Sequence, residues 1–286
     1  MEIIKNKIIM AKNEMQWSSA TPGLLVLMVD QSGSMTLPYD GEDSRSEFAT
    51  KAVNRVINTL IQKNFDGKEP KNRCYVAVVG YDAEVNILAS GYLKDLERSP
   101  KRIASIRKKV SDGDGGAIEI DTKMPIWVEP IYEDRCTNMM GAFEMVYDLV
   151  NNWIKDKASY PAPVIINISD GLPYDGRDIE ECMDETISIV KKIKGLSTVD
   201  GNVQIFNAMI GEGKKVVFPK SESMLDSTEA QFLYQISTEI PEAYRSAAIM
   251  NELEFETGAR GAIYNADAEH LVKLIDFGSS KGQGDK

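Results

Sequence analysis

The stretch LLVLMVDQSGSMTLPYDGED, residues 24 to 43, decides the fold and points to a site. Residues 24 to 29 contain no polar side chain and show no alternation, a pattern typical of a strand buried on both faces of a parallel sheet. Asp30, Ser32 and Ser34 follow at every second position, with Gly33 between the serines. Because open α/β sheets bind ligands beyond the carboxyl ends of their strands, we expect these three side chains to face a ligand.

A second apolar run, VIINISD at residues 164 to 170, also ends on an aspartate. A third segment brings Thr137, just before a helix expected from about residue 138, to the same edge of the sheet. The combined set offers oxygen ligands and no nitrogen or sulfur, which suits Mg²⁺ or Mn²⁺ in preference to Ca²⁺. The predicted metal ligands are Asp30, Ser32, Ser34, Thr137 and Asp170.

Helix capping is the alternative explanation for these residues, because serine and aspartate after a strand commonly cap the next helix. For the first three residues alone this alternative has real weight. The addition of Thr137 and Asp170 in matching topological places favours the metal site.

The rest of the chain alternates strands and helices. Apolar runs predict strands at residues 74–82, 203–211 and 261–266, and residues 85–90 follow so closely on the first of these that they predict an antiparallel edge strand. Helical periodicity predicts helices at residues 45–63, from 138, from 178, and near 228–237, 242–254 and 268–277. The pattern predicts an α/β fold, a doubly wound and mostly parallel central sheet with one antiparallel edge strand and helices on both faces.

The chain has 286 residues, enough for one large α/β domain. We expect a single domain at residues 21–277, an N-terminal extension at 1–20 and a disordered tail at 278–286. Residues 91–135 show weak periodicity, so they predict a short helix and then a long excursion, inserted into the domain.

Composition excludes several classes of protein. The hydrophobic content of 43% and charged content of 27% are ordinary for a soluble protein, and the net charge of −11 disfavours binding to nucleic acid or to an anionic membrane. The sequence shows neither a membrane span nor an apolar signal-peptide core, and its three cysteines form no CxxC pair. One histidine leaves little material for histidine-based catalysis. We therefore expect a cytoplasmic protein that is not an enzyme.

The run DQSGS at residues 30–34, Thr137 ahead of a helix, and ISDG at residues 168–171 resemble the von Willebrand factor A domain in content and order. The resemblance covers about residues 20–275. It implies a metal-ion-dependent adhesion site, where a divalent cation coordinates an Asp or Glu of a partner protein, often coupled to movement of the last helix. Among family members, the chain most resembles intracellular bacterial ones related to tellurite-resistance proteins, which often work beside ATPases, kinases or phosphatases.

Partner contacts are expected from the 91–135 insertion. Trp127 and Tyr132 are aromatic residues in a polar loop that should lie near the metal, and Met139 is a candidate for the lining of the ligand groove. Two alternatives stay open. A metal-dependent hydrolase would need a general base beyond the carboxylates assigned to the metal. A scaffold would bind through the 91–135 insertion and keep the metal site only as a relic.

Overall fold

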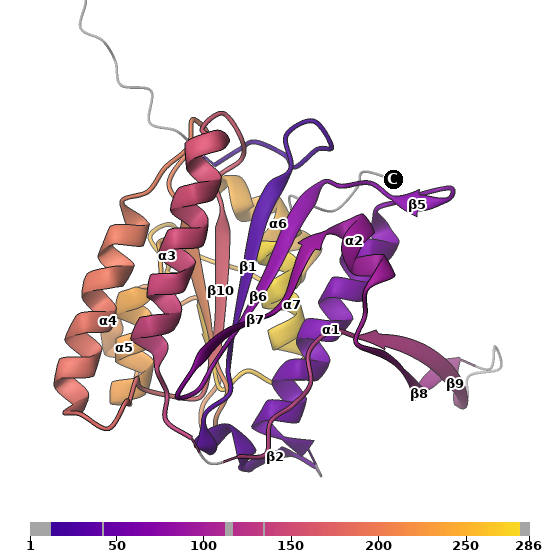
Figure 1. Ribbon diagram of the computed structural model, residues 1–286. Coiled ribbons are helices and arrows are strands. Elements are labelled where there is room, and N and C mark those ends of the chain that lie inside the picture. The colour runs from indigo at the N-terminus through magenta and orange to yellow at the C-terminus, as the bar shows by residue number, and fades with distance from the viewer. Residues whose placement is uncertain (1–12, 42, 112–116, 134, 281–286) are drawn as a thin grey trace, which may run out of the picture.

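A seven-stranded sheet forms the centre of the protein, in the order β12-β13-β11-β10-β1-β6-β7 (Figure 1). The computed structural model describes residues 13–41, 43–111, 117–133 and 135–280. The parallel strands are Gly23–Asp30 (β1), Cys74–Tyr81 (β6), Val164–Ser169 (β10), Gln204–Met209 (β11) and Ala262–Tyr264 (β13). The antiparallel edge strands are Val85–Tyr92 (β7) and Val216–Val217 (β12).

The predicted fold class is confirmed, with one addition. The sequence predicts a single antiparallel edge, whereas β12 adds a second edge strand on the far side of the sheet. This strand is two residues long and lies in a polar connection, so it has no periodicity of its own to reveal it.

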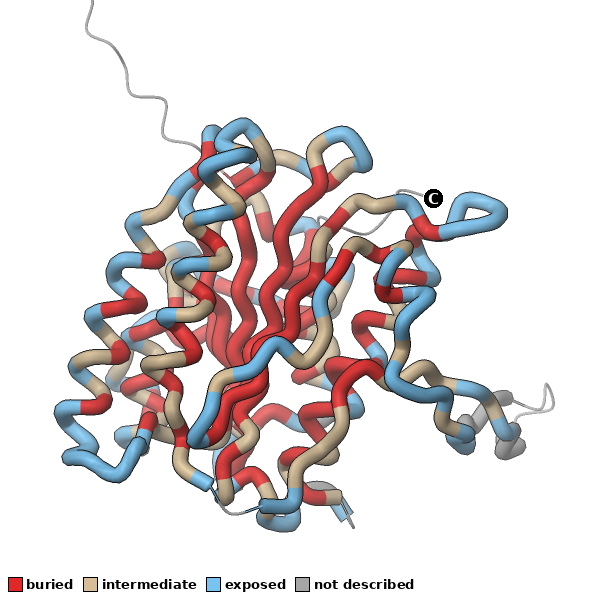
Figure 2. Tube along the Cα trace, in the orientation of Figure 1, coloured by how far each residue is buried: buried red, intermediate tan, exposed pale blue. Residues whose placement is uncertain are grey.

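Helices cover both faces of the sheet (Figure 1). One face carries Met139–Asp156 (α3), Ile179–Lys194 (α4) and Thr228–Ile236 (α5), and the other carries Arg45–Lys63 (α1), Leu93–Arg98 (α2), Arg245–Met250 (α6) and Ala268–Gly278 (α7). Successive side chains of β1 alternate between the two cores: Leu25 and Leu27 pack with the α1 side, and Leu24 and Val26 with the α3 side. The central strands are therefore buried throughout (Figure 2).

The shorter elements lie mostly in connections. They are the strands Pro38–Asp40 (β2), Asp43–Ser44 (β3), Phe65–Asp66 (β4) and Glu69–Pro70 (β5), and the 3₁₀ turns Gly33–Thr36 (η1), Glu222–Met224 (η2) and Glu242–Tyr244 (η3). The β2–β3 hairpin leads directly into α1, whose N-terminus is closed by a capping box between Ser44 and Glu47.

Residues 91–135 are only partly an excursion. Helix α2 packs on the core through Leu93 and Leu96, after which Arg102–Ser111 (β8) and Ala117–Ile126 (β9) pair as an antiparallel ribbon that projects beside α1 (Figure 1). The chain then returns to the core at Trp127, whose indole Nε1 donates to the Leu96 carbonyl at 2.9 Å. Asn54 of α1 anchors this return, because its Oδ1 accepts from the Trp127 N–H at 2.8 Å.

The described part of the N-terminal extension packs on the domain. The backbone N–H of Asn13 donates to the Asp200 carbonyl at 2.7 Å, and Trp17 is a core residue with 3% of its surface exposed. Residues 1–12 and most of the predicted tail, 281–286, lie outside the described residues. The three cysteines are free thiols, and no helix in the described part of the chain has the length and apolar character to cross a bilayer.

Candidate metal site

The two aspartates of the predicted site meet at the carboxyl edge of the sheet. This edge lies beside β2 in Figure 1. Asp30 is the last residue of β1, and Asp170 directly follows β10. These strands are parallel neighbours, with Val29 opposite Ile168, so their ends lie together. In the sheet, β1 lies between β6 on one side and β10 on the other, so the order of the strands reverses direction at β1. Doubly wound sheets form their binding crevices at such a reversal.

Four of the five predicted ligands form one hydrogen-bonded cluster. The Asp30 carboxylate accepts from the Ser32 N–H at 2.9 Å and from the Ser169 hydroxyl at 2.7 Å. The Ser32 and Ser34 hydroxyl oxygens lie 3.1 Å apart, and the Ser34 hydroxyl donates to Asp170 Oδ1 at 2.9 Å. The cluster thus joins both aspartates through the serines between them.

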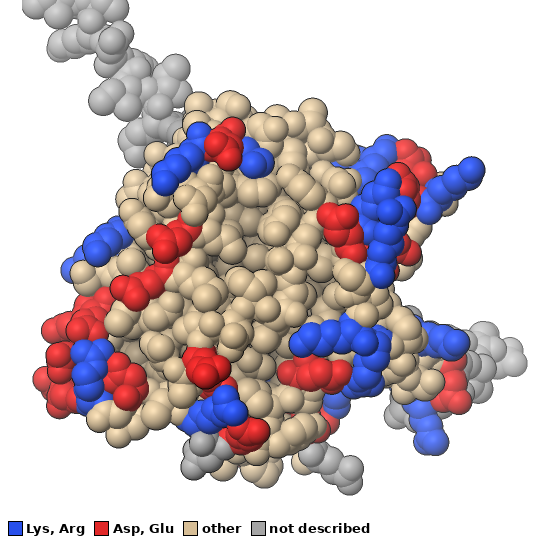
Figure 3. All heavy atoms as spheres, viewed as in Figure 1, with Lys and Arg blue, Asp and Glu red and all other residues tan. Residues whose placement is uncertain are grey.

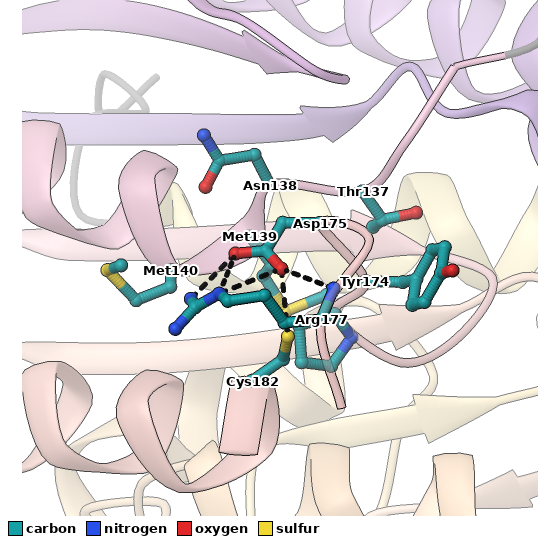
Figure 4. Close-up of a pocket in the computed structure, with 9 residues that line it drawn as sticks. Thr137, Asn138, Met139, Met140, Tyr174, Asp175, Arg177 and Cys182 are labelled. Carbon is teal, nitrogen blue, oxygen red and sulfur yellow. Dashed lines mark hydrogen bonds and ion pairs between the residues drawn. The ribbon is translucent and has the colours of Figure 1, made fainter. Parts of the chain in front are cut away.

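The loop of Thr137 is tied to the loops that carry both aspartates. The Gly33 N–H donates to the Arg135 carbonyl at 2.9 Å, which links it to the loop after β1. Thr137 and Tyr174 exchange two backbone hydrogen bonds, of 2.6 and 2.9 Å, which link it to the loop after β10. Within the described part of the chain, the Thr137 hydroxyl has no hydrogen-bond partner (Figure 4).

Helix capping does not account for these hydroxyls. Asn138 caps α3, since its Oδ1 accepts from the Gly141 N–H at 3.0 Å. Ser32 precedes the η1 turn but its side chain makes no capping hydrogen bond. The hydroxyl oxygens of Ser32 and Ser34, although hydrogen-bonded within the cluster, keep lone pairs that can coordinate a cation, and so does that of Thr137.

The electrostatics of the two aspartates differ. Asp30 is fully buried, and this burial together with the nearby Asp170 charge raises the pKa of Asp30 from 3.8 to about 7, despite hydrogen bonds from Ser32 and Ser169. Asp170 instead forms an ion pair with Arg45, whose Nη1 lies 2.6 Å from Asp170 Oδ2. The sequence reasoning missed Arg45. The available signal was a basic residue in the first turn of a helix, where the helix dipole disfavours positive charge.

The donor set fits a small hard cation. It consists of two carboxylates and three hydroxyls on three loops, all oxygen. Among the described residues no group of three or more His, Cys, Asp or Glu side chains gathers to hold a metal, so this site depends on its hydroxyls. Oxygen ligands of this kind are preferred by Mg²⁺ and Mn²⁺, with water or an outside group completing the coordination.

No protein-family model and no curated protein matches the chain. Solved structures match its fold. The D319A mutant of the PilB minor pilin from Streptococcus sanguinis aligns with a TM-score of 0.50 and 13% identity, over 92% of this chain and 62% of that one. The chain has the fold of von Willebrand factor A domain structures.

Two further matches are weaker. Proximal thread matrix protein 1 from the mussel byssus, in a structure with a zinc-occupied MIDAS motif, aligns with a TM-score of 0.43 and 13% identity, over 90% of this chain and 48% of that one. The ArnB paralog VWA2 from Sulfolobus acidocaldarius aligns with a TM-score of 0.38 and 18% identity, over 83% of this chain and 47% of that one. This chain therefore spans about half the length of these two proteins and less than two thirds of PilB.

The structure changes two of the three expected partner contacts. Trp127 is 1% exposed, so its side chain cannot touch a partner. Met139 is among the residues that line a small pocket beside Thr137 (Figure 4), as expected, but its side chain is fully buried and cannot reach a partner. Tyr132 is 68% exposed, and its hydroxyl donates to Glu47 at the start of α1. The structure also exposes Leu37, which follows η1, and Tyr174, which follows β10, to 49% and 48%. Sequence reasoning missed both, because exposure depends on how the loops pack.

The loop after β10 is held by a small polar cluster beside Thr137 (Figure 4). Arg177 forms an ion pair with Asp175 at 2.7 Å, and the Cys182 thiol donates to the same carboxylate at 3.3 Å. The hydrogen bonds from Arg177 lower the pKa of Asp175 to about 2. The side chain of Asp175 is therefore committed to this cluster, which fixes the loop that carries Tyr174.

Proposed function

We propose that this protein is a metal-dependent protein-binding module, in which the site holds Mg²⁺ or Mn²⁺ and receives an Asp or Glu from a partner protein. The observation that carries the proposal is the continuous cluster of Asp30, Ser32, Ser34 and Asp170. Beside it, on a loop bonded to both sides of the cluster, lies the Thr137 hydroxyl, which has no hydrogen-bond partner among the described residues. A bound divalent ion would supply an electrophilic position for the partner's carboxylate.

The protein's own residues would keep that ion attractive to an anion. Hydroxyl ligands are neutral, so they hold a cation without cancelling its charge. The Asp30 carboxylate is engaged by the Ser32 N–H and the Ser169 hydroxyl, and Asp170 by Ser34 and Arg45. Hydrogen bonds to both carboxylates spread their negative charge over the surrounding donors.

The surface around the site suits a partner with apolar side chains beside its acidic residue. Leu37, Tyr132 and Tyr174 are exposed on the three loops that carry or adjoin the predicted ligands. Exposed aromatic residues at the rim of a polar site are frequent contributors to protein interfaces. These residues replace Trp127 and Met139 as the expected contacts.

The rest of the protein is acidic, so a bound cation would be a local positive charge in a negative field. The chain carries a net charge of −11, and acidic side chains gather over the start of α4 (Figure 3), which carries Glu180, Glu181, Asp184 and Glu185. Without a bound cation, this field would repel an acidic partner. The proposed interaction is therefore conditional on metal.

The finer parts of the proposal follow the sequence resemblance. We propose a cytoplasmic, non-enzymatic protein of the kind related to tellurite-resistance proteins, with an ATPase, kinase or phosphatase as its partner. The three free cysteines support the cytoplasmic location, and the single histidine supports a non-enzymatic role.

The test compares immobilised wild-type protein with Asp30→Ala in a cell extract, in Mg²⁺ and in EDTA. Asp148→Ala, which removes an exposed carboxylate on α3, serves as the matched control. A partner retained by wild type and control in Mg²⁺, and lost with EDTA or in Asp30→Ala, would support the proposal. Retention in EDTA would favour binding through the 91–135 insertion, and hydrolysis of phosphate esters in Mn²⁺ would favour an enzyme.

A further inference from the structure

The stability of the fold does not explain why an arginine occupies position 45. It is the first residue of α1, where the positive end of the helix dipole disfavours a cation. Its ion pair with Asp170 is mostly buried, with 18% and 4% of the two side chains exposed, and buried ion pairs add little net stability. Its Nε is buried and has no hydrogen-bond acceptor among the described residues. Its ion pair with Asp170 connects Arg45 instead to the candidate metal site.

The geometry divides the Asp170 carboxylate between two donors. Oδ1 accepts from the Ser34 hydroxyl at 2.9 Å, on the side of the predicted ligands, and Oδ2 accepts from Arg45 Nη1 at 2.6 Å. The guanidinium therefore turns one oxygen of Asp170 toward the cluster and neutralises the other. Arg45 does this from α1, while the ligands come from the loops at the end of the sheet.

We infer that Arg45 is a charge-setting and positioning residue of the proposed metal site. A divalent ion with the carboxylates of Asp30 and Asp170 sums to zero charge, which gives an acidic partner little to bind. The guanidinium of Arg45 brings the sum to plus one. The inference rests on the proposed function, and it assigns to Arg45 two opposite effects: it weakens binding of the cation and strengthens binding of a carboxylate to the loaded site.

The first measurement is Mn²⁺ binding by the full chain, followed by calorimetry. Arg45→Gln and Arg45→Ala remove the charge, Arg45→Lys keeps it, and Arg55→Gln removes the same charge from an exposed position about 15 Å further along α1. We expect the two charge-removing variants to bind Mn²⁺ about tenfold more tightly than wild type. In water, a single and a double positive charge about 6 Å apart repel each other by an energy that corresponds to about this change in affinity. Arg45→Lys and Arg55→Gln should stay within about twofold of wild type.

The second measurement uses acetate as the carboxylate probe. Acetate that enters the coordination shell displaces water from bound Mn²⁺, which lowers the relaxation rate of water protons. At saturating Mn²⁺, Arg45→Gln and Arg45→Ala should bind acetate about threefold more weakly than wild type, because two single charges about 6 Å apart in water interact half as strongly as a single and a double charge. Arg45→Lys and Arg55→Gln should match wild type. Structural damage would weaken both ligands together, so the opposite signs identify a charge effect.

The outcomes separate the two proposals. If wild type binds Mn²⁺ and the charge-removing variants bind it equally or less tightly, the role of Arg45 is refuted and the proposed function stands. Unchanged acetate binding in these variants refutes it as well. If neither wild type nor any variant binds Mn²⁺, the proposed function fails, and the role of Arg45 fails with it. Thermal melting of each variant confirms that the compared proteins are folded.

Discussion

Asp30→Asn should stabilise the metal-free protein at alkaline pH, although it removes a predicted metal ligand. The carboxyl group of Asp30 is fully buried, and burial with the nearby Asp170 charge raises its pKa from 3.8 to about 7. Asparagine fits the same contacts. Its Oδ1 can accept from the Ser32 N–H, and its amide can donate to the Ser169 hydroxyl in place of the bond that Asp30 accepts.

The direction of the effect follows from proton binding. Between pH 4 and pH 7 the native protein keeps the Asp30 proton, whereas the unfolded chain has released it. The free energy of unfolding therefore falls as pH rises through this window, and the loss is complete above about pH 7. At about 1.4 kcal/mol for each pH unit between the two pKa values, the total loss is about 4 kcal/mol. Asp30→Asn has no such proton and escapes the loss.

The assay is urea denaturation in EDTA at pH 4 and pH 8, for wild type, Asp30→Asn and the exposed control Asp148→Asn. The stability of Asp30→Asn relative to wild type should rise by about 4 kcal/mol between the two pH values, and the control should follow wild type. Replacing EDTA with Mg²⁺ at pH 8 should raise the free energy of unfolding of wild type but not that of Asp30→Asn, because the ion stabilises only the protein that binds it. Parallel pH profiles for wild type and Asp30→Asn would refute the reasoning.

Three other substitutions test the remaining assignments. Trp127→Ala should lower the free energy of unfolding, measured in urea, by about 3–5 kcal/mol because the side chain is buried in the core, whereas truncation of the exposed residue in Tyr132→Ala should change it by less than about 1 kcal/mol. Equal effects of the two substitutions would contradict these roles. Thr137→Ala should still bind Mg²⁺, more weakly, but lose much of its partner affinity, as measured by calorimetry at saturating metal; partner binding as tight as that of wild type would show the threonine to be dispensable. Replacing residues 104–124 with an Asn-Gly turn removes most of the projecting ribbon but keeps Trp127, so the domain should still fold cooperatively and should select different partners in pull-downs. Loss of the cooperative melting transition would show that the ribbon is part of the core.

The main elements of the fold were predictable because their signals are local. The apolar runs of β1 and β10 mark strands buried on both faces, and the capping box at Ser44 marks the start of α1. The predicted helix at residues 45–63 agrees with α1 at both ends. The ribbon of β8 and β9 was not predicted because it projects away from the core. Ile103 and Ile106 of β8 are exposed, and without one buried face the sequence has no need to alternate apolar and polar residues.

The choice of candidate ligands also came from local patterns, namely two strands that end on aspartate and serines at alternate positions after the first. The structure places Asp30, Ser32, Ser34 and Asp170 in one cluster, and the loop of Thr137 beside them. This convergence was foreseeable because neighbouring parallel strands end at the same edge.

The sequence by itself determined the order of the main strands and helices along the chain, the edge of the sheet at which the candidate site lies and the all-oxygen chemistry of its predicted ligands, since each depends on local patterns of residues. Only the tertiary structure decided what surrounds that site. Arg45 and Asp170 are 125 positions apart, and their ion pair forms only once α1 packs beside the sheet. Trp127 lies in an irregular segment whose local pattern does not show that it is buried. Its burial depends on hydrogen bonds with Asn54 of α1 and Leu96 of α2. Pairing across such separations is set by packing of the whole chain, and a local pattern carries no record of it.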